Sequence, residues 1–124
     1  MKLSQLLDKK FTDALSALST IEVDGKTALN ISAVIDRALL HVRDYDEKRI
    51  NLLKTFSEKN EDGSPKLSED GKDFVIADTD GFKAGYEKLL DTEVEMNTLD
   101  LDLIKKLKKV TPATLIAIKP LIEQ

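Results

Sequence analysis

Apolar residues recur at steps of three and four along most of this 124-residue chain, the spacing that gathers side chains on one face of an α-helix. The longest such run covers residues 31–57, and only Arg49 interrupts it. We expect one long helix there, with Asn30 as its N-cap and the rest of the fold packed around it. Its apolar stripe has two candidate partners, other segments of the same chain or a second copy. The stripe consists of Ile31, Ile35, Ala38, Val42, Tyr45, Leu52 and Phe56.

Shorter helices are predicted before and after the long one. Their apolar positions follow the same steps, and each segment begins with a side chain that can accept a hydrogen bond from the first helical turn. Thr111-Pro112 is a good start signal, because threonine caps a helix and proline fits its first turn. The segments are 4–19 with Ser4 as cap, Thr79 or Asp80 to Leu90, a short helix opened by Asp100 or Asp102, and Thr111 to Pro120.

Three segments have features of β structure. Asp24-Gly25 and Asp70-Gly71 each lie between short runs, and Asp-Gly is a frequent hairpin turn because glycine accepts positive φ. A simple loop between two helices fits residues 20–29 almost as well. From Thr92 the pattern alternates, with Val94 and Met96 on one side, which is typical of a half-exposed strand.

We therefore expect a single α+β domain over residues 1–124, mostly α. Four or five helices are arranged around the long central helix, with one or two small β-hairpins or strands. The length suits one hydrophobic core, since such cores commonly enclose about 100–150 residues. With four Phe, two Tyr and no Trp, aliphatic residues must fill most of it.

Charge is distributed unevenly along the chain. Residues 58–102 contain fourteen Asp or Glu against five Lys, whereas residues 103–124 contain five Lys and one Glu, within a total of −4. The acidic balance disfavours binding to nucleic acid or to an anionic membrane, since both require a cationic face. We expect surfaces rather than a reactive pocket to carry the function.

Composition also bears on compartment and chemistry. The chain has no Cys, which excludes disulfides, thiolate metal sites and cysteine nucleophiles. No stretch approaches the roughly 20 apolar residues of a membrane-spanning helix, and the N-terminal MKLSQLLDKKF is too charged for a signal peptide. An intracellular protein is expected, without a cofactor or a bound metal.

Few residues are candidates for catalysis. His41 is the only histidine and lies off the main stripe of the long helix, and no serine has the context of a nucleophile elbow. Glu93 and Glu95 alternate on the wet face of the predicted strand, where little would raise a carboxyl pKa. No catalytic residue is predicted, and the glycines have the wrong spacing for a phosphate-binding loop.

An acidic turn at residues 58–69 partly matches a calcium-binding loop. With Gly63 at the sixth position, the ligand positions 1, 3, 5 and 12 hold Glu58, Asn60, Asp62 and Glu69. The first position is Glu rather than Asp, and residues 70–76 are predicted to form a turn and strand instead of the exiting helix. We interpret the segment as an acidic turn, and calcium binding there stays open.

Two charged groups are the candidate partner-binding residues. The lysines have the composition of a helix C-terminus, and phosphate contact is the weaker alternative because no aromatic residue lies among them. The basic group can also meet the acidic one of a neighbouring copy, which would give head-to-tail oligomers weakened by salt. The acidic group is Glu93, Glu95, Asp100 and Asp102, and the basic group is Lys105, Lys106, Lys108 and Lys109.

Three short motifs carry a resemblance to a known group of proteins: residues 59–63 (KNEDG), residues 89–95 (LLDTEVE) and Thr111-Pro112-Ala113. The order of these motifs resembles small bacteriophage proteins in which a long helix leads into a K-x-E-D-G turn, a short hairpin and a helix. A strand and a leucine-rich tail follow in those proteins. The resemblance implies a phage origin and no catalytic residues.

The expected function is therefore that of a non-enzymatic, phage-encoded interaction or assembly protein, either a virion component or an accessory factor. Its partner would be another phage protein or a second copy, in the cytoplasm of a bacterial host cell or in a virion. The alternative is an acidic inhibitor of a host protein. Such an inhibitor would occupy a basic groove by imitating the charge of a nucleic acid.

Overall fold

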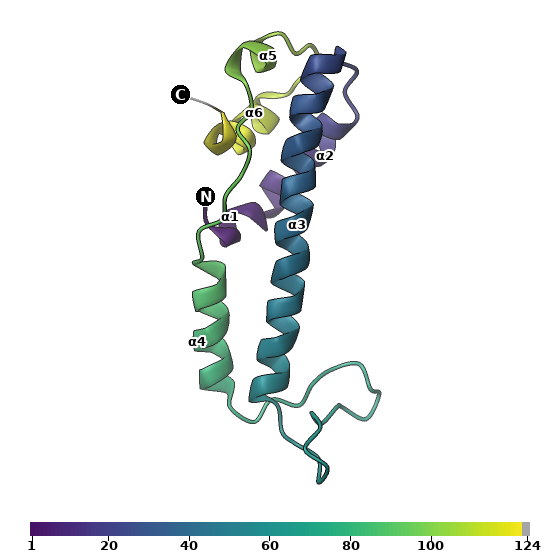
Figure 1. Ribbon diagram of the computed structural model, residues 1–124, viewed down its shortest axis with the longest axis vertical. Coiled ribbons are helices and arrows are strands. Elements are labelled where there is room, and N and C mark those ends of the chain that lie inside the picture. The colour runs from purple at the N-terminus through teal and green to yellow at the C-terminus, as the bar shows by residue number, and fades with distance from the viewer. Residues whose placement is uncertain (123–124) are drawn as a thin grey trace. The chain divides into compact units, whose positions relative to one another are not determined.

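Helices make up most of the chain in the computed structural model, which describes residues 1–122; 61% is helical and no β-sheet forms in that range. The predictions of a mostly helical protein and of one long helix are confirmed. The elements are α1 (Leu3–Leu6), α2 (Lys9–Ser19), α3 (Gly25–Phe56), α4 (Thr79–Leu90), α5 (Leu101–Lys105), α6 (Pro112–Ile118) and the 3-10 helix η1 (Lys119–Leu121) (Figure 1).

The chain divides into two compact units. The first comprises Met1–Val42 together with the chain from Glu93 onward, and the second comprises Arg43–Thr92. The division falls within α3, so the first part of this helix belongs to one unit and its second part to the other.

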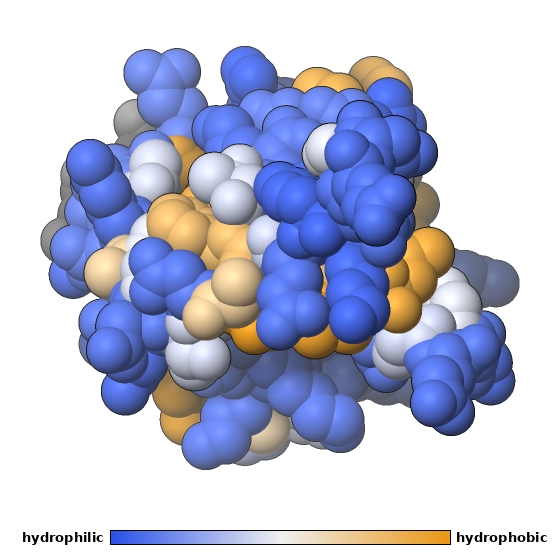
Figure 2. All heavy atoms as spheres, turned by 90° about the horizontal axis from the view of Figure 1, so that it is seen from below, coloured by the Kyte–Doolittle hydropathy of each residue, from blue (hydrophilic) through white to orange (hydrophobic). Residues whose placement is uncertain are grey.

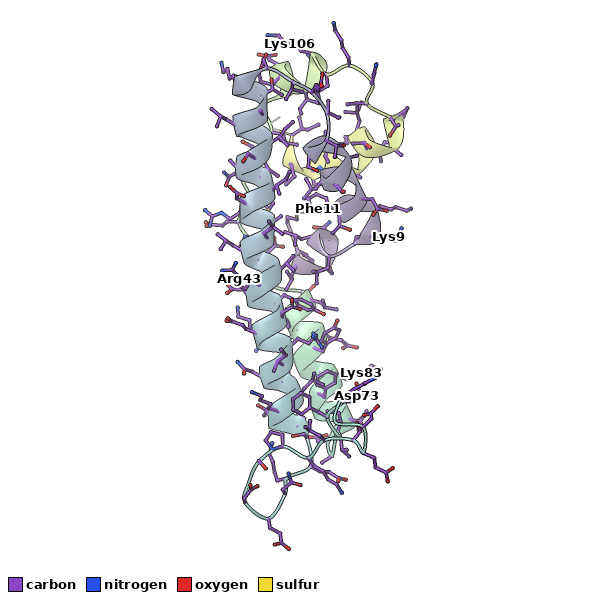
Figure 3. The ribbon with its side chains drawn as sticks, turned by 90° about the vertical axis from the view of Figure 1, so that its right-hand side faces the viewer. Lys9, Phe11, Arg43, Asp73, Lys83 and Lys106 are labelled. Atoms are coloured by element: carbon purple, nitrogen blue, oxygen red, sulfur yellow. The ribbon has the colours of Figure 1, made fainter. Side chains whose placement is uncertain are left out.

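The core of the first unit forms between short helices and the first part of α3. α2 packs against α1 and α6. In Figure 3 Phe11 points into this unit and Lys9 points away from it, as expected for an amphipathic helix. The side chains with the least exposure are Leu6, Leu18, Val34, Leu99 and Ile118.

The helix expected over residues 4–19 is divided in two, and Ser4 is not its cap. Asp8 interrupts it, because its carboxylate accepts a hydrogen bond from the Lys10 backbone N–H at 2.8 Å and thereby begins α2 as an N-cap. α1 before it is a single turn, in which the Gln5 side chain accepts from the Lys2 backbone N–H at 2.8 Å.

The long helix begins earlier than predicted, and the hairpin over residues 20–29 is wrong. The Asp24 carboxylate accepts from the Thr27 backbone N–H at 2.8 Å, and the Ala28 N–H donates to the Asp24 carbonyl at 2.9 Å. These bonds begin α3 at Gly25, which does not adopt the positive φ that the hairpin turn would need. The predicted alternative, a loop between two helices, is what forms.

Asn30 lies inside α3 and connects distant parts of the chain instead of capping the helix. Its amide nitrogen donates to the Thr98 carbonyl at 3.1 Å, and its side-chain oxygen accepts from the Asp100 backbone N–H at 3.0 Å. The nitrogen and the oxygen of the Asn30 side-chain amide therefore both hold residues 98–100 against the first part of α3.

The second predicted hairpin, around Asp70-Gly71, is also wrong. Gly63 and Gly71 do adopt positive φ in turns, at 86° and 73°. The flanking residues, however, form only isolated antiparallel bridges, such as the one between Leu67 and Phe74. Two turns within so few residues leave no run long enough for a ladder, and Pro65 lacks the N–H that a ladder would use.

The strand expected from Thr92 is absent as well, so within residues 1–122 the α+β class is corrected to a mostly helical fold without a β-sheet. Glu93 forms a single bridge with Lys2, and the Val94 N–H donates to the Met1 carbonyl at 2.8 Å. The pairing stops there because the chain turns into α1 at Leu3. Six α-helices form in the described range, the long one and five others, which agrees with the four or five predicted around the long helix.

The second unit is built by packing α4 against the second part of α3, side by side in Figures 1 and 3. Two glycines of α4 allow the close approach. A Cβ atom on Gly85 would lie 2.9 Å from a methyl carbon of Leu52, and one on Gly81 would lie 2.7 Å from a ring carbon of Phe56. The hydroxyls of Tyr45 and Tyr86 are 2.6 Å apart.

The remaining helix starts agree with the sequence except for the cap of α4, which is Asp78 instead of the predicted Thr79 or Asp80. Asp100, one of the two predicted residues, caps α5. Thr111 caps α6 with Pro112 in its first turn, as predicted. α6 gives way to η1, which contains Pro120.

Within residues 1–122, none of the helices combines the length and the apolar character needed to cross a membrane.

Replacing Asn30 with Ala tests its connecting role. The change removes two hydrogen bonds and leaves the Asp100 N–H without this acceptor, so we expect a loss of about 1–2 kcal/mol in the free energy of unfolding. Denaturant unfolding followed by circular dichroism measures it. The matched control is Asn51→Ala on an exposed part of the same helix, which should cost nothing because alanine favours helices. Equal stability of the two variants would contradict the assignment.

Candidate functional site

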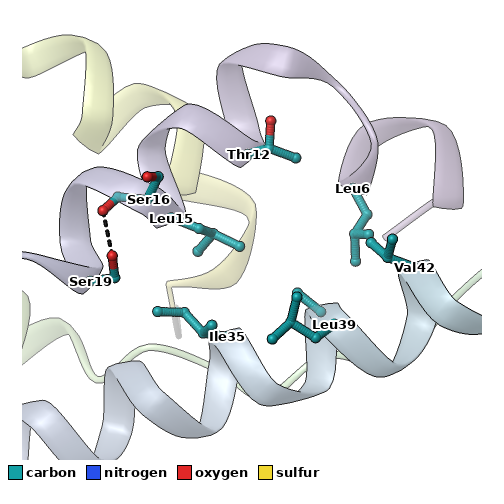
Figure 4. A pocket seen from close by; sticks show the side chains of 9 residues that line it. Leu6, Thr12, Leu15, Ser16, Ser19, Ile35, Leu39 and Val42 are labelled. Carbon is teal, nitrogen blue, oxygen red and sulfur yellow. Dashed lines mark hydrogen bonds between the residues drawn. The ribbon is translucent and has the colours of Figure 1, made fainter.

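An apolar groove lies between α2 and the first part of α3, and we call it the α2–α3 groove (Figure 4). Its volume is about 200 Å³. The hollow arises because α2 presents small hydroxyl residues here, Thr12, Ser16 and Ser19, at steps of four and three. The apolar lining consists of Leu6, Leu15, Ile35, Ala38, Leu39 and Val42.

Two of the three hydroxyl groups beside the groove donate to carbonyl groups of their own helix. Thr12 donates to the Lys9 carbonyl at 3.1 Å, and Ser19 donates to the Ser16 carbonyl at 2.6 Å. The groove therefore offers mainly hydrocarbon to a ligand. Leu39 lies at its edge and is 59% exposed.

A second hollow of about 250 Å³ continues along the same two helices. It shares Ser19 and Ile35 with the first and extends toward Val23 and Ala28. Together they follow α3 for more than three turns, which is the shape that a helix of another protein fills.

Exposed apolar residues occur on other elements too. Figure 2 shows one face, on which hydrophilic residues surround separate hydrophobic patches. Single exposed apolar residues are normal, so we give weight only to those that share an element. The large ones are Leu29, Leu39, Leu40, Ile50, Leu67, Leu101, Leu115 and Ile116.

The predicted acidic group does not form one free patch. Glu93 accepts from the amino group of Met1 at 3.0 Å, and the Glu95 carbonyl accepts from His41 Nε2 at 2.5 Å. Asp100 caps α5 by accepting from the Asp102 N–H at 2.9 Å. Three of the four residues thus take part in local structure, two of them through a carboxylate, whereas Asp102 is an exposed residue of the first turn of α5.

The predicted basic group lies at and after the end of α5, and all four lysines are exposed. Lys106 and Lys108 line a hollow of about 340 Å³ together with Glu22 and Asp24. The structure therefore brings two of the four lysines to acidic residues near the start of α3, a neighbourhood that the sequence did not indicate. The group consists of Lys105, Lys106, Lys108 and Lys109.

Asp24 is the acidic residue of this hollow with a perturbed pKa. The backbone N–H of Thr27 is the largest cause and its hydroxyl the second, and both hold the pKa of Asp24 below its ordinary value of 3.8. The charges of Lys106 and Lys26 lower this pKa further. A lowered pKa in the folded state means that the stabilisation is present above the unfolded pKa and is lost as the pH falls through the folded one.

The tyrosine pair of the second unit has a shift of the opposite sign. Burial, followed by the hydrogen bond with Tyr86, raises the pKa of Tyr45 to about 12. The stabilisation from the neutral hydroxyl is therefore present below pH 10 and lost as the pH rises toward 12. This makes the pair a structural contact at neutral pH.

The candidate calcium loop folds as a hydrogen-bonded turn. The Asp62 carboxylate accepts from the Ser64 backbone N–H at 3.0 Å and from its hydroxyl at 2.5 Å. The hydroxyl bond, followed by the backbone one, lowers the pKa of Asp62. Across the described chain, 1–122, His, Cys, Asp and Glu side chains nowhere gather in a group of three that could hold a metal ion.

The α2–α3 groove was missed at the level of sequence. Leu39 falls outside the stripe that predicted the buried face of α3, so it was not counted as functional. The signal was nevertheless there, since Ser32, Ile35, Leu39 and Val42 follow steps of three, four and three on a neighbouring face of the same helix.

Comparison of the chain with models of protein families, with curated proteins and with solved structures found no match.

The cause of the lowered pKa of Asp24 can be tested by removing one of the two hydrogen bonds from Thr27 that lower it. In Thr27→Val the hydroxyl is lost but the backbone N–H stays, so the pKa of Asp24 should rise toward 3.8, and acid unfolding should begin at a higher pH. Carboxyl titration by NMR measures both. Asp70, whose pKa is lowered by Ser68, is the internal reference and should not move. An unchanged Asp24 would contradict the assigned cause.

Proposed function

We propose that this protein is a non-enzymatic interaction or assembly component that binds another protein through the α2–α3 groove. The observation that carries the proposal is the groove itself, with an apolar lining and a 59% exposed Leu39 at its edge. Fully burying a leucine contributes about 1.5–3 kcal/mol, so a few such contacts give a useful affinity.

The partner that suits the groove is an amphipathic helix. A groove between two helices accepts a third one whose apolar residues recur at steps of three and four. The hydroxyl side chains of Thr12, Ser16 and Ser19 are short, so the backbone of a partner helix can approach α2 closely. On the resemblance to small bacteriophage proteins, we propose that the protein acts as a virion component or as an accessory factor in a bacterial cell.

Leu39→Ser tests the proposal by removing apolar contact area at the edge of the groove. We expect affinity for the protein partner to fall about ten- to one-hundredfold. The partner is captured with the wild-type protein as bait, identified by mass spectrometry, and titrated against both variants. Leu101→Ser is the matched control, since Leu101 is 38% exposed on α5 and outside the groove. Equal loss in both variants, or none in either, would contradict the proposal.

A second candidate function is acidic inhibition of a basic host protein. The specific support is the exposed turn segment of the second unit, where hydrogen bonds from serines keep the pKa of Asp62 and of Asp70 low and both carboxylates charged. A partner bound through these charges would be held by electrostatics, whereas a helix in the groove would be held by apolar contact.

Salt dependence separates the two functions. For an inhibitor, we expect the affinity to fall at least tenfold between 50 and 300 mM salt, roughly the range over which the Debye length shrinks below 10 Å. It should also fall when Asp62 and Asp70 are changed to Asn, and Leu39→Ser should have no effect. For binding through the groove, we expect the affinity to change little with salt or with the two Asn substitutions and to fall in Leu39→Ser. The measurement is a titration of the captured partner at each salt concentration.

A further inference from the structure

A second site lies in the hollow of about 340 Å³ between the end of α5 and the residues that lead into α3, and we call it the charged hollow. All of the residues that line it belong to the first unit, and they differ from those of the α2–α3 groove. Its volume falls within the range of about 300–1,000 Å³ that is usual for small-molecule sites.

Opposite charges lie on the two walls of the charged hollow. Glu22 and Asp24 belong to the loop before α3, whereas Lys106 and Lys108 belong to the residues that follow the last turn of α5. Figure 3 shows Lys106 beside the start of α3. The charge of Lys106 contributes to the lowered pKa of Asp24, so the two walls are close enough to act on each other.

The charges on the two walls face each other without pairing. The ion pairs of the described residues, 1–122, do not include Glu22, Lys106 or Lys108, and all three residues are exposed. Asp24, by contrast, uses a carboxylate oxygen to begin α3. Glu22 is therefore the available carboxylate of the acidic wall, and both lysines are available on the basic wall.

Hydrocarbon lies between the two charged walls. Val23 and Leu107 are half-buried in the lining of the hollow, and Leu103 is buried there. A ligand that reaches both walls must therefore cross an apolar surface. Contact with this surface favours a ligand whose middle part is apolar too, because water is then released from both.

We propose that the charged hollow binds a small zwitterion, with an ammonium group at one end of a short hydrocarbon chain and a carboxylate at the other. The ammonium group pairs with Glu22, the carboxylate pairs with Lys106 and Lys108, and the chain covers the apolar lining between them. This site is separate from the groove and does not depend on the proposed function.

The arrangement of charges selects a zwitterion over a simple anion or cation. An anion bound to the two lysines would lie near Glu22 and Asp24, and a cation bound to Glu22 would lie near the lysines. Each would therefore meet a like charge on the opposite wall, which costs affinity. A zwitterion finds an opposite charge on both walls. Its two charges must be well separated, because the walls themselves are too far apart to form ion pairs.

The test uses 6-aminohexanoate as the probe, since its two charges lie at opposite ends of a hydrocarbon chain. Titration of the full chain, followed by two-dimensional NMR of the backbone amides, should give saturable shifts at residues 22–27 and 103–108. We expect a dissociation constant of about 1–10 mM, because pairs at an exposed site are weak. Hexanoate and hexylamine each lack one charge, and the charges of glycine are adjacent. All three should bind weaker than the probe by about fivefold or more.

Variants assign the two walls. Glu22→Gln should weaken 6-aminohexanoate about fivefold without weakening hexanoate, because only the ammonium group loses its partner. The double variant Lys106→Gln/Lys108→Gln should weaken 6-aminohexanoate by at least as much. The matched control is Lys105→Gln/Lys109→Gln, which removes the same charge from exposed lysines outside the lining of the hollow. It should keep the affinity within about twofold of wild type.

Three results overturn the inference: shifts that do not saturate or that centre on other residues, equal binding of hexanoate and 6-aminohexanoate, and an equal loss in the control variant. The same spectra show that each variant is folded. None of these results bears on the proposed function, because the probe and the partner of the groove contact different residues.

Discussion

The structure depends on a limit of helix packing: each neighbour can cover only one side of α3, whereas the apolar residues of this helix extend over more than one. Thr27, Ile31, Val34 and Ala38 are buried in the first unit. Ile35, Leu39 and Val42 lie on the next side, where the hydroxyl residues of α2 are too small to cover them. The groove and the exposed leucines follow from this mismatch, and burial by another polypeptide is its simplest physical resolution.

Much of the fold could be predicted from periodicity and capping residues. Apolar stripes indicated the long helix and α4, and Asp100 and Thr111 are caps of α5 and α6 as predicted. The predicted caps of the first two helices were wrong, since Asn30 lies inside α3 and Asp78 caps α4. Errors arose where one residue type suits two structures. Asp24-Gly25 suits both a hairpin turn and a helix start, and in the folded chain Asp24 accepts from the Thr27 N–H at the start of α3.

The candidate site was less predictable than the fold. Charge patterns indicated partner-binding residues, but counting charges does not reveal which carboxylates are already occupied. Glu93 is bound to the N-terminal amino group, and Asp100 serves as a cap. The groove depends on the sizes of residues on two helices, Ser16 and Ser19 opposite Ile35 and Leu39, and only their packing turned two ordinary patterns into a hollow.

The first unit is discontinuous in sequence, with Arg43–Thr92 inserted between its two stretches. α2 packs on α6, and Asn30 binds residues 98–100, so its core includes contacts of large sequence separation. Such contacts slow folding, because the ends of a long loop must meet before they gain any energy. During synthesis the N-terminal stretch leaves the ribosome long before α6 exists, so the side of α2 that packs on α6 stays without this cover until then. A chaperone that binds nascent apolar segments would therefore meet this chain early, whereas Arg43–Thr92 is one continuous stretch of the chain and can fold before α6 is synthesised.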